Sequence, residues 1–250
     1  MPRVQIALNE VMDEQRTLDR RIAGRLFGLL LAALAAGALG YLVLGAPLRV
    51  RQVIVTGDLL LDRAAVVQAA DVLGANPFRV QTSAVEQRVL GLGVPASARV
   101  HVELPDAVVI QITEKTPAYL WKVDPTLYLV SADGVILAPT TSESRRVIVV
   151  DADRRPVRVG DRVDVRILRE AAYLMTVLPN TAGLSPRYVL YSRALGVVVP
   201  TPDGLQVAFG DDRQLTEKAA EAAAVLQAAR QHQPRPTLVD LGVADHPYFR

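Results

Sequence analysis

The longest feature in the pattern of apolar and polar residues is an unbroken apolar run. Leu26 to Ala46 contains no charged residue. As a helix it would be about 31 Å long, which matches a bilayer hydrocarbon core of about 30 Å. Because only a helix satisfies its own backbone polar groups inside lipid, we expect a membrane-spanning helix at 26–46.

Flanking charge predicts the orientation of this helix. Four arginines lie shortly before the run and two shortly after it: Arg16, Arg20, Arg21, Arg25, Arg49 and Arg51. The excess favours a cytoplasmic tail at 1–25 and an outer domain. A cleaved signal peptide is the alternative, although its apolar region is usually only ~7–15 residues long. The tail has apolar residues near heptad spacing, and both a partner helix and a solvated helix fit them.

Shorter patterns between residues 50 and 121 predict the order strand, helix, helix, strand, strand. A strand at 50–57 ends at a glycine, and Asp62 begins a helix over 63–73. Ser83 and Glu86 have the spacing of a capping box for the second helix. Two alternating strands follow, joined at Pro105-Asp106. The expected inward-facing residues are Val66, Ala69, Ala70, Leu73, Val85, Val89, Leu92, Val100, Val102, Leu104, Val108, Ile110 and Ile112. This order predicts a two-layer α+β unit whose helices cover one sheet face.

The remaining residues predict a second domain with a mixed β-sheet and covering helices. Asp133-Gly134 between two apolar runs is a strong hairpin signal. Asp164 begins a helix that Pro179 ends, and 214–231 is a second helix with a stripe of small and apolar residues. Further strands are expected at 147–150, 188–192, 196–200, 205–209 and 237–241.

Composition limits the chemistry of this chain. Half of the 250 residues are apolar, the net charge is +2, and there is no cysteine. Disulfides and thiolate sites are therefore excluded, and no basic stripe suggests nucleic acid. His101, His232 and His246 lack metal-ligand spacing, and no phosphate-binding loop or nucleophile motif occurs. We expect no catalytic residues, metal, cofactor or small-molecule substrate.

A group of acidic residues between the predicted strands and helices raises the alternative hypothesis of an enzyme. Asp151, Asp153, Asp161 and Asp164 alternate with arginines, a pattern typical of a solvated surface. A membrane-tethered hydrolase would need two carboxylates in one cleft. That class has no motif to support it.

Three segments carry a resemblance to a known family. They are VRQVIVTGDLLLDRAAVVQAA, NPFRV and VELPDAVVIQITEKTPAYLW, and the similarity continues through YLVSADGVIL to the ending VDLGVADHPYFR. Together they resemble the FtsQ/DivIB family of bacterial division proteins, which joins a POTRA domain to a second β domain. The resemblance implies a POTRA domain at 48–121 and the second domain at 122–250. Gly242 is a departure, because family members often carry arginine there.

The predicted partner site is a sheet edge. The strand 237–241 comes last in the sequence, so we expect it to lie at an edge that can accept a partner's strand. Aromatic residues follow it, and they fit equally an interface or a terminus pinned to the core. In the FtsQ/DivIB family the second domain docks FtsB/DivIC- and FtsL-type partners. Carried over, the site is Thr237, Leu238, Val239, Asp240, Leu241, Tyr248 and Phe249.

The resemblance implies a non-enzymatic, single-pass scaffold of the divisome. It would lie at the division septum and help to assemble and regulate septal cell-wall synthesis. The alternative is a POTRA-containing accessory protein of protein export or envelope assembly. Such proteins usually carry repeated POTRA units, and no second copy is visible here.

Overall fold

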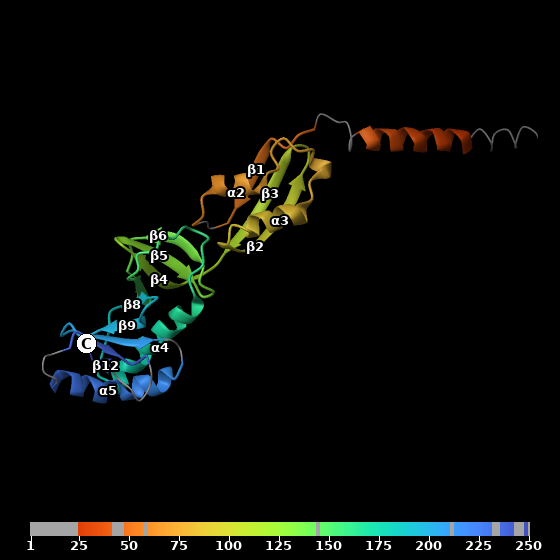
Figure 1. The fold of residues 1–250 in the computed structure, drawn as a ribbon. Helices are drawn as coiled ribbons and strands as arrows, with labels where there is room; N and C mark the ends of the chain where they lie inside the picture. Colours follow the sequence, from red (N-terminus) through yellow and green to blue (C-terminus); the bar gives the residue numbers. More distant parts are fainter. Residues whose placement is uncertain are drawn as a thin grey trace, which may run out of the picture. The chain divides into compact units, whose positions relative to one another are not determined.

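The computed structural model describes residues 25–41, 48–57, 60–143, 146–210, 213–231, 236–242 and 248–249 (Figure 1). The chain divides into two compact units. The first comprises 1–54, 72–82 and 101–109, and the second comprises 55–71, 83–100 and 110–250.

Residues 25–41 form a helix within the expected membrane span. The last part of that span, 42–46, and the predicted tail up to residue 24 lie outside the described residues. Within the described ranges, no helix combines the length and the apolar character needed to cross a membrane.

The order of elements after residue 50 confirms the predicted α+β unit. A three-stranded sheet has the order β1-β3-β2. Asp62 begins α2 as predicted, because its carboxylate accepts a hydrogen bond from the Ala64 amide at 3.0 Å. The elements are β1 (Gln52–Thr56), α2 (Arg63–Ala70), the 3₁₀ turn η1 (Pro77–Arg79), α3 (Thr82–Leu90), β2 (Pro95–Glu103) and β3 (Ala107–Glu114).

Two local predictions for this region were wrong. Glu86 does not close a capping box, because its carboxylate accepts a hydrogen bond from the Val100 amide of β2 at 2.9 Å. Helix α2 ends three residues early, at Ala70, because Asp71 adopts a left-handed conformation with φ of 47°. Leu73 therefore lies outside the helix and is exposed, and Leu104 is exposed in the β2–β3 turn.

A nine-stranded mixed sheet forms the larger part of the second unit. Its order is β12-β11-β10-β9-β8-β7-β4-β5-β6. The pairs β4–β7, β7–β8 and β10–β11 are parallel, and the other pairs are antiparallel. The strands are β4 (Pro117–Val123), β5 (Thr126–Ser131), β6 (Ile136–Thr140), β7 (Ile148–Asp151), β8 (Val189–Ser192), β9 (Gly196–Pro200), β10 (Gln206–Gly210), β11 (Leu238–Asp240) and β12 (Tyr248–Phe249). The domain boundary predicted between residues 121 and 122 falls inside β4.

Helices α4 (Val165–Thr181) and α5 (Leu215–Gln231) pack on one face of this sheet. Asp164 begins α4 as predicted, with its carboxylate 2.9 Å from the Arg166 amide. Pro179 does not end α4, which continues to Thr181. A proline this close to the carboxyl end disrupts little of the helix. The shared core includes Trp121, Val149, Leu168, Leu174, Val189, Val199, Phe209, Ala222, Leu226 and Val239.

The four aspartates between β7 and α4 make specific hydrogen bonds. Asp151 is 2% exposed, so the prediction of a solvated surface is wrong for this residue. Its carboxylate accepts bonds from Arg155 Nε at 3.1 Å and from the Asp153 amide at 3.0 Å. Arg155 also lies over the Tyr191 ring, 5.2 Å from its centroid. Asp151 is thus part of the folded core of this turn.

Asp133, in the β5–β6 turn, lies in a cluster of donors. Lys115 Nζ is 2.7 Å from Asp133 Oδ2, and the Ser131 hydroxyl is 2.6 Å from Oδ1. Arg162 Nη1 lies 3.3 Å from the same carboxylate. The hydrogen bond from Lys115, followed by that from Ser131, outweighs the opposing effect of burial and lowers the pKa of Asp133 to about 2.

Asp133 is therefore expected to make stability depend on pH under acidic conditions. An aspartate in an unfolded chain has a pKa of about 3.9, so the folded state binds fewer protons below that pH. The contribution of Asp133 is complete above pH ~4 and is lost as the pH falls towards ~2. Urea unfolding between these pH values should show a shallower decline for Asp133→Asn than for the parent chain. An equal decline would contradict the assignment. Glu217→Gln, at an exposed carboxylate on α5, is the control.

Candidate partner-binding site

The predicted partner-binding residues lie on the last two strands of the nine-stranded sheet. β11 pairs with β10 in parallel, with Val207 opposite Val239. On its other side β11 pairs with β12, where Val239 is opposite Phe249 and Asp240 is opposite Tyr248. The prediction that 237–241 forms the edge was therefore wrong, because β12 covers that side and is itself the edge strand.

The side chains of these strands divide between the core and solvent. Val239 and Leu241 are fully buried, and Phe249 packs against the same core cluster. Thr237 is exposed, and Tyr248 is 65% exposed. Of the two interpretations of the aromatic ending, the pinned terminus applies to Phe249, whereas Tyr248 remains available for contact.

The face that carries Tyr248 is the one opposite the two helices. Neighbouring residues of a strand point to opposite faces, and Phe249 already points into the core. The register places Tyr248 next to Asp240 and then Ala208, on the same face. A strand added beyond β12 would therefore meet the Tyr248 ring on that face.

The opposite edge of the sheet, β6, is closed where it begins. The Gly160 amide donates to the Ile136 carbonyl, and the Ile136 amide donates to the Asp161 carbonyl, both at 2.9 Å. Arg162 also forms a bridge with Val135. Farther along β6, Pro139 has no amide hydrogen to offer. Of the two edges, β12 is the one suited to accept another strand.

Gly242, which follows β11, occupies the position at which the family resemblance predicts arginine. Its amide donates to Asp240 Oδ1 at 2.7 Å. A Cβ atom at Gly242 would lie 2.8 Å from that same oxygen. A side chain here would require the Asp240 carboxylate to move.

A cleft near the carboxyl ends of β8, β10 and β11 contains candidate acid and base groups. It has a volume of about 370 Å³ and is lined by Asp164, Arg166, Glu170, Arg193, Asp240 and Gly242, among others. Asp164 already caps α4, and its hydrogen bonds from Arg166 lower its pKa. Asp240 is engaged with the Gly242 amide. These carboxylates therefore have structural roles.

Histidine and carboxylate clusters suited to a metal are absent from the described part of the chain. His101 is exposed, as predicted, and lies 3.4 Å from Glu103. His232 and His246 lie outside the described residues.

Comparison with known proteins identifies the family. The model of the FtsQ-type POTRA domain matches residues 48–115. The cell division protein FtsQ of Chloroflexus aurantiacus is 30% identical over 206 residues, which cover 82% of this chain and 76% of that protein. The chain belongs to the FtsQ family of cell-division proteins. FtsQ of Chloroflexus aggregans is 28% identical over the same shares of both chains. FtsQ of Streptomyces coelicolor is 28% identical over 80% of this chain and 76% of its own length.

Membership of the FtsQ family confirms the resemblance seen in the sequence. The similarity extends beyond the POTRA segment into the second domain, since it covers about four-fifths of the chain. A POTRA protein of export or envelope assembly would share only the first part. A role in cell division follows from the family, and the alternative in export loses its support.

Proposed function

We propose that this FtsQ-family chain is a non-enzymatic membrane scaffold of the divisome that docks a partner's strand at β12. The supporting observation is that β12 is the last strand in the order of the nine-stranded sheet among the described residues, whereas the first residue of β6, Ile136, is bonded to the 160–161 segment. The partners are division proteins of FtsB/DivIC and FtsL type. Docking them would help to assemble and regulate septal cell-wall synthesis.

The proposal retains the predicted membrane topology. Residues 26–46 anchor the chain, the tail at 1–25 is cytoplasmic, and the POTRA domain (48–121) and second domain (122–250) lie outside the membrane. The uncharged sequence of Leu26 to Ala46 supports the anchor. Partners fixed in the same membrane meet at a high effective concentration, so a small interface is sufficient.

Strand addition explains how so short an edge can recognise a partner. Backbone groups along a strand point alternately to either side, so an edge strand can offer alternate N–H and C=O groups to an added strand. These bonds supply affinity independent of the partner's sequence. The exposed Tyr248 ring then adds an aromatic anchor of the kind that often dominates an interface.

Tyr248→Asp is expected to lower partner affinity by about tenfold or more, since an exposed tyrosine would be replaced by a charge at the added strand. Thr237→Asp is the matched control: it is also exposed, but it lies beside β11, which β12 already covers. Co-purification of the full chain with its tethered FtsB/DivIC-type partner measures the effect.

Comparing Tyr248→Asp with Thr237→Asp also distinguishes a site at the β12 edge from a site at 237–241. If Thr237→Asp weakens binding as much as Tyr248→Asp, the partner does not add at the β12 edge. Thermal unfolding of both variants should match that of the parent chain, because both side chains are exposed. Full partner binding by both variants would overturn the docking assignment.

A further inference from the structure

Three large apolar side chains are exposed on connections of the first compact unit. Leu73 is 57% exposed, Phe78 is 39% exposed and Leu104 is 59% exposed. Leu73 lies between α2 and η1, Phe78 lies in η1, and Leu104 lies in the β2–β3 turn. Single exposed apolar residues are common, but these three occur on neighbouring connections. We refer to them as the tip surface.

Backbone hydrogen bonds hold these connections against the segment that leads into β1. Val50 forms two hydrogen bonds with the connection between α2 and η1. Its carbonyl accepts from the Gly74 amide, and its amide donates to the Ala75 carbonyl, both at 2.9 Å. The next amide, that of Arg51, donates to the Asp106 carbonyl at 2.8 Å. Gly74, which follows Leu73, and Asp106, two residues after Leu104, are thus bonded to residues 50–52.

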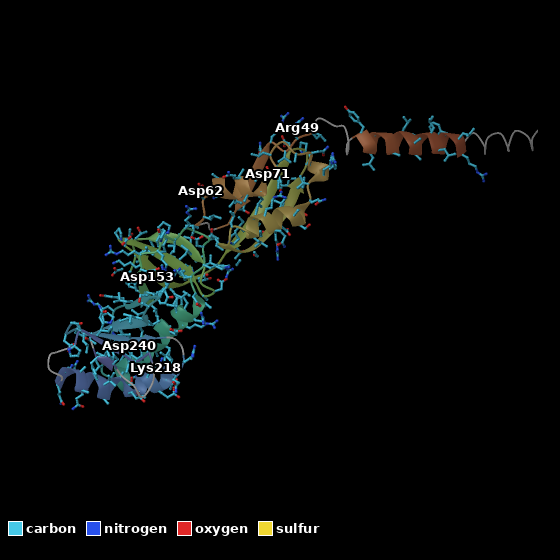
Figure 2. All side chains as sticks on the ribbon, in the orientation of Figure 1. Arg49, Asp62, Asp71, Asp153, Lys218 and Asp240 are labelled. Atoms are coloured by element: carbon cyan, nitrogen blue, oxygen red, sulfur yellow. The ribbon has the colours of Figure 1, made fainter. Side chains whose placement is uncertain are left out.

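Arginines accompany the apolar side chains. Arg49, Arg51 and Arg79 are exposed in the same unit (Arg49 is labelled in Figure 2). Arg49 Nη1 lies 3.4 Å from the Gly74 carbonyl, which holds its guanidinium beside the connection that carries Leu73. The acidic groups near these side chains among the described residues are Asp71, which is exposed two residues before Leu73, Glu103 and Asp106. The arginines thus lie beside the apolar side chains without giving the tip surface a net positive charge.

The length of chain between the anchor and this segment limits where the tip surface can be. This step rests on the proposed anchor at 26–46. Residues 50–52 are four to six residues beyond Ala46, and six residues span at most about 22 Å when fully extended. These residues, and the connections bonded to them, therefore lie within that distance of the outer end of the anchor.

We propose that the tip surface binds the outer leaflet of the membrane. Leu73, Phe78 and Leu104 enter the interfacial region, where apolar side chains leave water without crossing the bilayer. The guanidinium groups of Arg49, Arg51 and Arg79 bind the phosphates of anionic lipids. The lipid surface would in this way fix the first unit at the membrane beside its anchor.

A spin-label experiment on the full chain tests the proposal. The chain has no cysteine, so Leu104→Cys provides a single labelling site. Leu60→Cys is the matched control, because Leu60 is 49% exposed and its amide is bonded to Glu114 rather than to residues 50–52. Each nitroxide-labelled chain is inserted into phosphatidylcholine vesicles with and without phosphatidylglycerol. Collision with oxygen, relative to a water-soluble nickel reagent, reports immersion in lipid.

The label at position 104 is expected to lie roughly 5 Å or more below the headgroups in anionic vesicles, with a collision ratio about threefold higher than at position 60. Arg51→Gln with Arg79→Gln should reduce the difference, while Arg49 keeps its bond to Gly74. Equal, water-like ratios at 104 and 60 would overturn the proposal. Immersion that is unchanged by lipid charge or by the arginine variants would overturn the part assigned to arginine.

Flotation distinguishes failure of this inference from failure of the proposed function. If the chain floats with the vesicles and position 104 stays in water, only the lipid contact is wrong. If the chain does not float with the vesicles, the anchor fails and this inference fails with it. Partner binding at β12 is measured separately and does not depend on the outcome at the tip surface.

Discussion

Replacing Gly196 with alanine is expected to lower the free energy of unfolding by about 4 kcal/mol. Gly196 begins β9 with φ of +66°, a conformation that costs other residues about 1–2 kcal/mol. The larger part comes from the neighbouring strand. A Cβ atom at Gly196 would overlap the carbonyl oxygen of Gly210 in β10, where the β9–β10 register shifts. Because that oxygen is backbone, the strands would have to separate.

Gly183→Ala separates the conformational cost of a positive φ from the cost of the overlap with Gly210. Gly183 has nearly the same conformation, with φ of +65°, but a Cβ atom there would meet nothing within 4 Å. It should lose only the conformational part, about 1 kcal/mol. The chain has one tryptophan, Trp121, buried in the core of the nine-stranded sheet, so its fluorescence reports urea unfolding directly. Equal losses for both variants would mean that the close approach to Gly210 does not constrain the sheet.

Local sequence patterns predicted the elements whose signals are local. Asp133-Gly134 gave the β5–β6 hairpin, and Asp62 and Asp164 gave two helix starts. The stripe Ala219, Ala222, Leu226 and Ala229 gave the buried side of α5. In each case the interaction that decides the structure joins residues within a few positions of one another, so the pattern is visible in a single sequence.

Interactions between distant residues account for most of the errors. Glu86 has a suitable local partner at Ser83, but its carboxylate binds the Val100 amide instead. Asp151 has the neighbours of a surface residue, yet it is 2% exposed, and its partner Arg155 lies over the ring of the distant Tyr191. A side chain that reaches a distant amide or ring leaves no periodic trace in the sequence. Pairings such as that of β4 with β7 are hidden for the same reason.

For the predicted partner-binding residues, the sequence pattern misidentified the edge strand. The sequence predicts a strand at 237–241 from a short apolar run, Leu238, Val239 and Leu241, which only Asp240 interrupts. β12 has only two residues, too few to show alternation. The order of the two strands therefore had to come from the sheet register, which moves the open edge from Thr237 and its neighbours to Tyr248 and Phe249.

Two glycines next to this site, Gly210 and Gly242, allow the sheet and α5 to pack closely. A Cβ atom at Gly210 would lie 2.9 Å from the Gly242 Cα and 3.6 Å from Lys218 Nζ. The missing side chains thus let the chain after β11 approach the end of β10. The absence of a side chain at Gly210 also leaves room for the amino group of Lys218, which is on α5. Gly210 and Gly242 therefore allow the backbone to pack closely against the buried Lys218. This packing holds α5 against the last strands.

Lys218→Ala is expected to destabilise the fold by about 3–5 kcal/mol. Lys218 is only 1% exposed, and its Nζ donates a hydrogen bond to the Phe209 carbonyl at 2.8 Å (Lys218 is labelled in Figure 2). It lies four residues before Ala222 on the buried stripe of α5, where the neighbouring alanines leave space for a long side chain. Alanine would leave a cavity along the lost stem and an unpaired carbonyl in β10. Urea unfolding followed by Trp121 fluorescence measures the loss.

Lys218→Met separates the stem from the amino group. Methionine fills most of the same volume but cannot donate to the Phe209 carbonyl, so about 1–3 kcal/mol should be lost. Gln227→Ala, at an exposed position on the same helix, should change the stability by no more than about 0.5 kcal/mol. If Lys218→Ala is as mild as Gln227→Ala, the lysine does not support the packing of α5 against the last strands. If Lys218→Met is as severe as Lys218→Ala, the hydrogen bond matters more than the filled volume.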